Sequence, residues 1–482
     1  MIEPIAARSA PLRLLADQAF SRTAGAPLIG GNAVRLLIDA AENFPAWLDA
    51  IGSAERSILF ESYIVGNDET GKQFRDALAA RARAGVSVCV LYDWLGSPGK
   101  FVPGFWRPLI AAGASVRAFN PPRFVSPLGW LSRDHRKSIS VDGRVAFVSG
   151  LCVAQVWRGN PAAAKEPWRD TGIEIRGPGV ADVERAFAQA WTASGGAFSD
   201  ASLTDPSTIP TAGDVSLRIV ASAPAEAGLM RLDQLIASIA RKRLWLTDAY
   251  FVPVTAYVQA LGAAARDGVD VRLLVPGASD IPLVARLSRS AFRPLLEAEV
   301  RVFEWNGTML HAKTAVADGR WARVGSSNLN LASFVGNYEL DVAVEDAGFA
   351  ATMEHQYLAD LSRSTEIVLE RRRARRAVPL QPGSLHARRA PSGSAGRAAA
   401  GAVRFGSTVG TAILHPGALA YGNAKIMLGA SVALGVIALV GMKWPWIIAW
   451  PLAMVALWFA LAFLIRAWRG RRGSGPVGDD AA

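Results

Sequence analysis

Two short segments of the chain combine residue types that could handle a phosphate ester. "HRK" begins at His135 and "HAK" at His311, and in each a lysine stands two positions later, at Lys137 and Lys313. An imidazole titrates near neutral pH, so it can act as a nucleophile or as a proton donor. An ammonium group can hold a phosphoryl oxygen as a point charge. These four residues are therefore candidates for phosphoryl transfer in which one histidine attacks phosphorus and the other protonates the leaving alkoxide.

Both segments occupy the same place in a repeated pattern. The strand-like runs "SILFESYIV" (57–65) and "RLWLTDAYFV" (243–252) are each followed by a helical pattern ending in glycine, then by two further strand-like runs, and only then by the histidine. Two copies of one β-α-β plan predict an α/β fold with two pseudo-symmetric lobes, each a mixed sheet flanked by helices. A pseudo-twofold axis would bring both His-Lys pairs to one cleft between the lobes.

The elements around each pair suggest how they are positioned. Residues two apart on a strand face the same side, so we expect each His-Lys pair to lie on a strand. Asp-Gly dipeptides at Asp142 and Asp318 predict hairpin turns, whose return strands come back beside the histidines. In the second copy this places Ser326 and Asn328 as phosphate-binding candidates. For the two aspartates, turn formation with a structural salt bridge is favoured over direct chemistry, although their spacing includes them in the candidate catalytic set.

The doubled motif resembles a known family. "HRKSISVD" and "HAKTAVAD" match the H-x-K-x4-D signature of the phospholipase D superfamily, and "VGSSN" with "GNYELDV" matches the residues that come after the second signature in that family. Other stretches, such as "WRDTGIEIRGPGV", look like bacterial cardiolipin synthases, and the resemblance spans roughly residues 28–369. It implies a two-lobed fold and a phosphohistidine intermediate. It also implies that an acidic residue orients the histidine of the opposite lobe, and Glu339 and Asp170 match those places.

The first copy departs from this family pattern. Cys152 stands where the second copy has Asn328, and Gly172 stands where a histidine is common. The missing amide removes one phosphate-facing donor, which leaves slower turnover, a shifted acceptor preference or a divergent activity open. Cys152 and the other cysteine, Cys89, both sit in apolar runs and are expected to be buried, reduced thiols. No metal-ligand cluster is evident, and the chemistry needs no cofactor.

The resemblance implies phosphatidyl transfer, in which two molecules of phosphatidylglycerol give cardiolipin and glycerol, with phosphatidylethanolamine as a further potential substrate. Three alternatives stay open: a phospholipase D that makes phosphatidic acid, a nuclease or other phosphodiesterase, and a non-catalytic membrane scaffold on the same fold. The net charge of +11 arises almost entirely after Arg371, and the preceding part is close to neutral. A nucleic-acid partner is therefore not expected, since such proteins carry basic charge on the folded domain.

The C-terminal part predicts attachment to a membrane. Two uncharged apolar runs, 426–442 and 447–465, approach the length a helix needs to cross the hydrocarbon core. Arginines flank the pair on both outer sides, while only Lys443 lies between the runs, so both ends should face the cytoplasm. A buried helical hairpin is the alternative. No secretory signal is evident at the N-terminus, so we expect the catalytic lobes in the cytoplasm, at the bacterial inner membrane.

These patterns together predict the domain organisation of the chain. The expected segments are an N-terminal extension (1–27), a first phospholipase D-like lobe (28–198), an inter-lobe linker (199–214), a second such lobe (215–370), a basic flexible linker (371–423), a transmembrane hairpin (424–468) and a basic tail (469–482).

Overall fold

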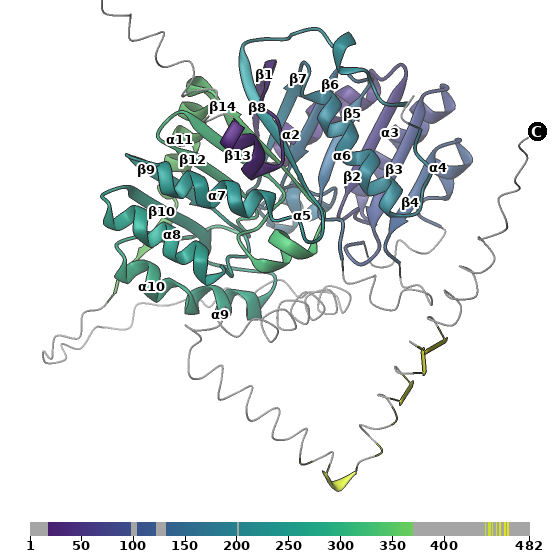
Figure 1. Ribbon diagram of the computed structural model, residues 1–482. Helices are drawn as coiled ribbons and strands as arrows, with labels where there is room; N and C mark the ends of the chain where they lie inside the picture. Colours follow the sequence, from purple (N-terminus) through teal and green to yellow (C-terminus); the bar gives the residue numbers. More distant parts are fainter. Residues whose placement is uncertain are drawn as a thin grey trace, which may run out of the picture. The chain divides into compact units, whose positions relative to one another are not determined.

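The computed structural model describes residues 18–97, 104–121, 132–199 and 202–369, together with single residues between 439 and 461 (Figure 1). Contacts divide them into two units. The larger unit holds the described residues up to Phe119 and from Arg133 to Leu369, and the smaller one holds Asn120, Pro121, Ser132 and the described residues between 439 and 461. All elements given below belong to the larger unit.

The first half of the larger unit alternates strands and helices as the repeat predicts. Its elements are β1 (Ile29–Ile38), α2 (Asp39–Gly52), β2 (Ser57–Ser62), α3 (Glu69–Arg83), β3 (Ser87–Asp93), α4 (Arg107–Ala111), β4 (Ser115–Phe119), β5 (Lys137–Val141), β6 (Val145–Ser149), α5 (Gln155–Arg158), the 3₁₀ turn η2 (Pro161–Ala163), β7 (Thr171–Arg176) and α6 (Val180–Ala193). A further 3₁₀ turn, η4 (Pro206–Thr208), lies in the connection to the second half.

The second half repeats this order. Its elements are β8 (Val215–Ser222), α7 (Gly228–Ile239), β9 (Arg243–Thr247), α8 (Thr255–Arg266), β10 (Asp270–Pro276), α9 (Pro282–Ser290), α10 (Phe292–Glu297), β11 (Arg301–Trp305), β12 (Thr314–Ala317), β13 (Trp321–Gly325), the π-helical turn η5 (Ala332–Gly336), β14 (Glu339–Glu345), α11 (Ala347–Leu361) and β15 (Ser364–Ile367). Helices α3 and α8 are followed by Gly85 and Gly268, which both adopt positive φ, as expected for glycines that end helices.

The strands form one continuous sheet in the order β15-β11-β10-β9-β12-β13-β14-β8-β1-β7-β6-β5-β2-β3-β4 (Figure 1). Read outward from the centre, the two halves have the same order, with β15 added at one edge. Strands β2, β3 and β4 pair in parallel, as do β9, β10 and β11, whereas neighbours such as β5 and β6 or β12 and β13 are antiparallel, which confirms the expected mixed α/β class. The sequence did not predict that the halves share a sheet, through antiparallel pairing of β1 with β8 at Ile29–Leu217 and Asn32–Val215.

Helices cover both faces of each half. In the first half α2, α3, α4 and α5 pack their apolar side chains on one face, and α6 packs on the other. In the second half, α7, α8 and α10 pack their apolar side chains on the face that corresponds to the one covered by α2, α3, α4 and α5. Helices α6 and α11 contribute to one central hydrophobic cluster that includes strands from both halves. This shared core makes the two halves one packed body, which can hold side chains from both in register.

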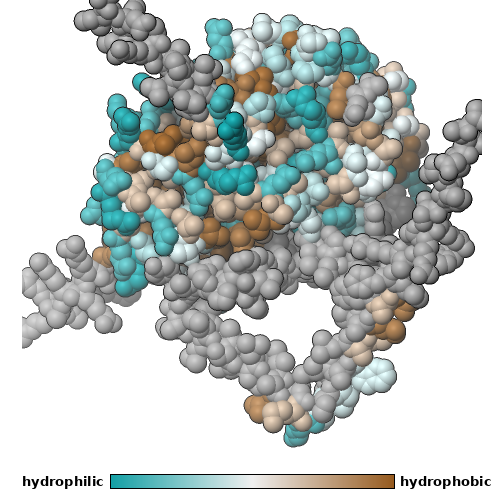
Figure 2. Space-filling model, viewed as in Figure 1, coloured by the Kyte–Doolittle hydropathy of each residue, from teal (hydrophilic) through white to brown (hydrophobic). Residues whose placement is uncertain are grey.

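The predicted transmembrane hairpin, 424–468, falls largely outside the described residues, as do the linker 371–423 and the tail 469–482. Within the part of the chain that the structure describes, no helix is both long and apolar enough to cross a bilayer. On the face shown in Figure 2, hydrophobic patches alternate with hydrophilic residues over the larger unit.

Candidate active site

The two histidines lie just before strands rather than within them. Strand β5 begins at Lys137, and β12 begins at Thr314, one residue after Lys313. The expectation that each His-Lys pair lies on a strand is therefore wrong. The backbone N–H groups of the histidines bond instead to the opposite half, His135 to the carbonyl of Tyr338 at 2.9 Å and His311 to that of Arg169 at 2.7 Å.

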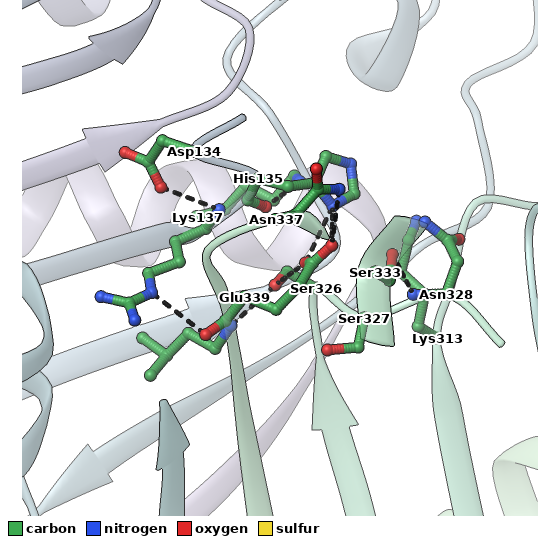
Figure 3. Close-up of polar contacts among 12 residues, drawn as sticks. Asp134, His135, Lys137, Lys313, Ser326, Ser327, Asn328, Ser333, Asn337 and Glu339 are labelled. Atoms are coloured by element: carbon green, nitrogen blue, oxygen red, sulfur yellow. Dashed lines mark hydrogen bonds and ion pairs between the residues drawn. The ribbon is translucent and has the colours of Figure 1, made fainter. Parts of the chain in front are cut away.

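His135 pairs with a carboxylate of the second half (Figure 3). Its Nδ1 atom lies 2.9 Å and 3.0 Å from the two carboxylate oxygens of Glu339, at the start of β14. Because a carboxylate only accepts, we assign a hydrogen to Nδ1, so Nε2 is the ring nitrogen that can gain or lose a proton. Ser326 donates to Glu339 at 2.6 Å and Asn337 donates at 3.3 Å, so this acid is held from several sides. Both dyad members are buried.

His311 makes the reciprocal pair. Its Nδ1 atom lies 2.7 Å from Oδ2 of Asp170, which immediately precedes β7 in the first half. Nε1 of Trp157 donates to the same oxygen at 2.9 Å, and the backbone N–H of Thr171 donates to Oδ1 at 2.9 Å. The structure thus brings each histidine to the acidic residue of the opposite half that the resemblance named.

Each lysine side chain folds back onto its own histidine. Nζ of Lys137 donates to the carbonyl oxygen of His135, and Nζ of Lys313 donates to that of His311. Nζ of Lys313 also lies 2.9 Å from Nδ1 of His311. The ammonium of Lys137 sits 5.3 Å from the ring centre of Tyr63. Both positive groups therefore remain beside the imidazoles although neither pair lies within a strand.

Burial and neighbouring charge set the ionisation of the second dyad. Burial, followed by the charge of Lys313, lowers the pKa of His311 to about 3, so this imidazole is neutral near pH 7. Burial raises the pKa of Asp170, but His311, Lys313 and Trp157 outweigh it and hold the value at about 2. Burial also lowers the pKa of Lys313 to about 8, which leaves it mostly charged at pH 7.

Electrostatic effects also cross between the halves. The charge of Lys137, in the first half, further lowers the pKa values of both His311 and Lys313 in the second. Burial raises the pKa of the Cys152 thiol, and Lys137 and Lys313 both act against that rise. The two lysines therefore share one electrostatic environment, with Cys152 within reach of both.

The two phosphate-binding candidates of the sequence differ in the structure. The hydroxyl of Ser326 is committed to Glu339 and to the backbone N–H of Leu340. By contrast, Oδ1 of Asn328 is buried and lacks a hydrogen-bond partner among the described residues, so the side-chain amide is not committed to the protein through this atom. Its Nδ2 group is the one that could donate to a phosphate oxygen, because Oδ1 only accepts. Its backbone N–H is fixed by Ser333 (Figure 3).

Asp142 and Asp318 lie away from the dyads. Each sits at positive φ in the turn beyond its strand, as the Asp-Gly pattern predicted. The carboxylate of Asp142 accepts three backbone N–H bonds from residues 55–57, and that of Asp318 accepts three from residues 241–243. At about 3.3 Å per strand residue, the five residues of β5, which lie between His135 and Asp142, alone span roughly 16 Å. The structure thus favours the turn interpretation over direct chemistry.

The aromatic surroundings of the imidazoles were missed by the sequence analysis. Tyr63 packs edge-on to His135 with ring centres 4.9 Å apart. Trp157, Trp168 and Tyr250 surround His311 at 5.3, 5.6 and 5.8 Å. The two tyrosines could have been found, because each comes shortly after a polar interruption in one of the repeated strand-like runs. These rings limit water around the imidazoles and restrict their rotation.

The arrangement suits nucleophilic substitution at phosphorus. Each imidazole ring is oriented by a carboxylate at Nδ1, so its Nε2 can act as a nucleophile or as a proton donor. An ammonium group lies beside each imidazole. Within the described part of the chain, no three His, Cys, Asp or Glu side chains gather as metal ligands.

Comparisons with known proteins give a matching family and relatives that are described as cardiolipin synthases. The profile of a family described as "Cardiolipin synthase, PLD-like domain" matches residues 232–361. The chain is 34% identical to a cardiolipin synthase of Alkalihalophilus pseudofirmus, over 71% of this chain and 68% of the relative. It is 34% identical to cardiolipin synthase A of Pseudomonas fluorescens strain SBW25, over 73% of each. Among solved structures, a phosphatidylserine synthase of Haemophilus influenzae superimposes with a TM-score of 0.58 at 15% identity, over 73% of this chain and 91% of that one.

Proposed function

The chain belongs to the cardiolipin synthase family of the phospholipase D superfamily, and we propose that it joins two phosphatidylglycerol molecules into cardiolipin and glycerol through a phosphohistidine intermediate. The observation that carries this proposal is the pair of reciprocal dyads, His135 with Glu339 and His311 with Asp170. Two oriented imidazoles meet the needs of a double displacement, in which one attacks phosphorus and the other moves protons.

In the first step, Nε2 of one histidine attacks the phosphorus of a phosphatidylglycerol. The P–N bond forms as the P–O bond to the glycerol head group breaks, and the second histidine gives its proton to the departing alkoxide. Lys137, Lys313 and Asn328 would stabilise the negative charge on the equatorial oxygens. In the second step, the hydroxyl of another phosphatidylglycerol loses its proton to the second histidine and attacks phosphorus. The P–N bond then breaks, and cardiolipin leaves.

We assign the attack to His311. A nucleophilic imidazole must be neutral, and burial together with Lys313 lowers the pKa of His311 to about 3. A group with so low a pKa would rarely hold the proton that the leaving alkoxide needs. His135 would therefore be the acid of the first step and the base of the second, with Glu339 stabilising its charged form.

The membrane is the expected site of this reaction because both substrates are bilayer lipids. We propose that the segment 424–468 anchors the catalytic part to the inner membrane from the cytoplasmic side. Support comes from the two uncharged runs and from the arginines that flank them. Phosphatidylethanolamine would be a further donor, since attack at phosphorus leaves the same phosphatidyl group on the histidine.

A lipid assay tests the activity. The full-length protein in phosphatidylglycerol vesicles should release cardiolipin and free glycerol in equal amounts. Phosphatidic acid with glycerol would instead identify a hydrolase, and absence of lipid turnover by a folded protein would overturn the proposal. His135→Ala and His311→Ala should each abolish cardiolipin formation, so full activity in either variant would contradict the shared mechanism.

A further inference from the structure

The residue that supplies each orienting carboxylate is also held through its backbone carbonyl, by an arginine. The carbonyl oxygen of Glu339 accepts from Nε of Arg136 at 3.0 Å, and the carbonyl oxygen of Asp170 accepts from Nη1 of Arg169. Both guanidinium groups are buried. Although the two dyads are related by the repeat, the arginines come from unrelated places: one lies between His135 and Lys137, and the other immediately precedes Asp170.

Arg136 bridges the two halves of the sheet. Within its own half, it donates to the carbonyl of Ala186 and, at 2.8 Å, to the side chain of Gln189, both on α6. Across the junction it donates to the carbonyl of Ser222 at 2.9 Å, at the end of β8, besides the carbonyl of Glu339. Its guanidinium also lies 5.3 Å from the ring centre of Tyr338, the residue before Glu339.

Arg169 makes the corresponding bridge at the other dyad. It forms a two-pronged pair with Asp360 on α11 of the second half, at 2.9 Å and 2.8 Å. In its own half it donates to Thr171 at 2.9 Å and contacts Asp39 at 3.3 Å. Its backbone exchanges hydrogen bonds with Met309 and His311, the segment that carries the partner imidazole.

We propose that Arg136 and Arg169 are positioning residues that fix the backbone of each orienting carboxylate against the half of the protein that supplies its histidine. This inference rests on the proposed function and goes beyond it. A planar fork with several directed donors can hold a carbonyl and its neighbours at once, which a lysine cannot do. Because a misplacement of about 1 Å can cost roughly 100-fold in rate, such a fixed backbone matters for the reaction.

A purely structural role is the competing explanation, since any buried arginine stabilises its surroundings. Arg218 provides a matched control. It is fully buried in β8, bonds to Glu345 at 3.1 Å and to Ser21 at 2.6 Å, and contacts neither dyad. Arg218→Lys makes the same chemical change at a comparable depth, so it reports the general cost of replacing a buried arginine.

The test compares Arg136→Lys, Arg169→Lys and Arg218→Lys in the full-length protein. In phosphatidylglycerol vesicles, kcat per folded molecule should fall about 10- to 100-fold for the first two at nearly unchanged KM. For Arg218→Lys, kcat per folded molecule should stay within about twofold of wild type, although its melting temperature falls. An activity loss that only follows the folded fraction in all three variants would overturn the proposal.

A second readout does not depend on activity. Histidine ring signals, followed by NMR in the labelled protein and assigned with His→Gln variants, report each dyad separately. Arg136→Lys should shift the signal of His135 and spare that of His311, and Arg169→Lys should do the reverse. Unchanged signals, or equal changes at both histidines, would contradict the proposal. If the wild-type protein made no cardiolipin, the proposed function would fail, yet these signals would still decide the role of the arginines.

Discussion

Nδ1 of His135 lies 2.9 Å from Oε2 of Glu339, which comes from the opposite half of the sheet. In the reciprocal pair, Nδ1 of His311 lies 2.7 Å from Oδ2 of Asp170. Neither half therefore contains a complete dyad, and each imidazole depends on the other half for its tautomer and orientation. A change that loosens the junction between the halves should affect both pairs.

Removing the charge of either carboxylate should impair catalysis more than folding. Glu339→Gln and Asp170→Asn keep the side-chain shape but replace a carboxylate, which only accepts, with an amide whose NH2 group can donate to Nδ1, so the wrong tautomer becomes available. We expect kcat to fall by roughly 10²- to 10⁴-fold, as for other histidine–carboxylate pairs. Initial rates of cardiolipin formation check this.

Glu184→Gln is the control for these two changes. Glu184 is a buried carboxylate that accepts from Ser140 at 3.0 Å and from the backbone of Thr204 at 2.9 Å, outside the dyads. The substitution should lower the melting temperature while rates per folded molecule stay close to wild type. Equal rate losses in all three variants would show that the dyad carboxylates act only on stability.

The low pKa of His311 predicts a specific pH dependence of stability. The folded-state pKa of about 3 lies below the ordinary value of 6.5, so the unfolded chain binds the extra proton between these values. The His311 contribution to the free energy of unfolding should therefore fall as pH drops below 6.5, by about 2 kcal/mol between pH 7 and pH 5. Burial raises the pKa of Asp233 to about 6 and that of Asp248 to about 7, so these two carboxyl groups change stability in the opposite direction over the same range. Asp170 adds almost no pH dependence of stability between pH 7 and pH 5, because its carboxyl titrates below pH 5 in both the folded and the unfolded chain.

His311→Asn isolates this contribution. Lowering the pH from 7 to 5 should shift the melting temperature less unfavourably in the variant than in wild type, because the residue that takes up the proton on unfolding is gone. Differential scanning measurements at the two pH values make the comparison. An identical shift in both proteins would show that His311 is not held neutral by its surroundings.

Cys152 stands where an amide would be a stronger phosphate donor. It is buried, and its thiol lies within electrostatic reach of both lysines. We expect Cys152→Asn to raise kcat about three- to ten-fold, since a thiol is a weak hydrogen-bond donor. Cys152→Ala, which removes only the thiol, should stay within about twofold of wild type. A rate for Cys152→Asn at or below that of Cys152→Ala would indicate that this position does not face the phosphate.

The two turn aspartates should matter for stability and not for chemistry. Against burial, which raises it, backbone donors at residues 55–57 and the side chain of Arg144 lower the pKa of Asp142 to about 2. Asp142→Ala and Asp318→Ala each leave three backbone N–H groups without an acceptor, which should cost about 1–3 kcal/mol. Denaturation curves measure this loss. If a variant that remains fully folded lost roughly two orders of magnitude in turnover rate, these residues would return to the catalytic set.

Truncation after Arg404 tests the membrane anchor. The shortened protein should lose most of its binding to phosphatidylglycerol vesicles in flotation experiments, because the two uncharged runs are gone. Its melting temperature should match that of the full-length protein, and its circular dichroism should show the expected α/β content. Every described element of the larger unit precedes the cut. An insoluble or unfolded product would favour the alternative of a hairpin buried in the core.

Much of the fold follows from local pattern. The alternation of strand-like runs and helical patterns, the glycines after α3 and α8, and the Asp-Gly turns are short-range signals, and the structure has all of them. The position of the His-Lys pairs could not be read in this way. They pair with segments of the opposite half, and no local pattern distinguishes a residue before a strand from one within it.

The sequence by itself determined the duplicated α/β plan, the two His-Lys pairs and, through resemblance, the identity of their acidic partners. Only the tertiary structure decided that β1 and β8 join the halves into one sheet, that Ser326 is committed to Glu339, and that Arg136 and Arg169 donate to the backbone carbonyls of Glu339 and Asp170. The physical reason is separation along the chain. Contacts between residues far apart in sequence form only when packing brings the halves together. The acceptors of a buried guanidinium are therefore set by the groups that this packing places within hydrogen-bond distance.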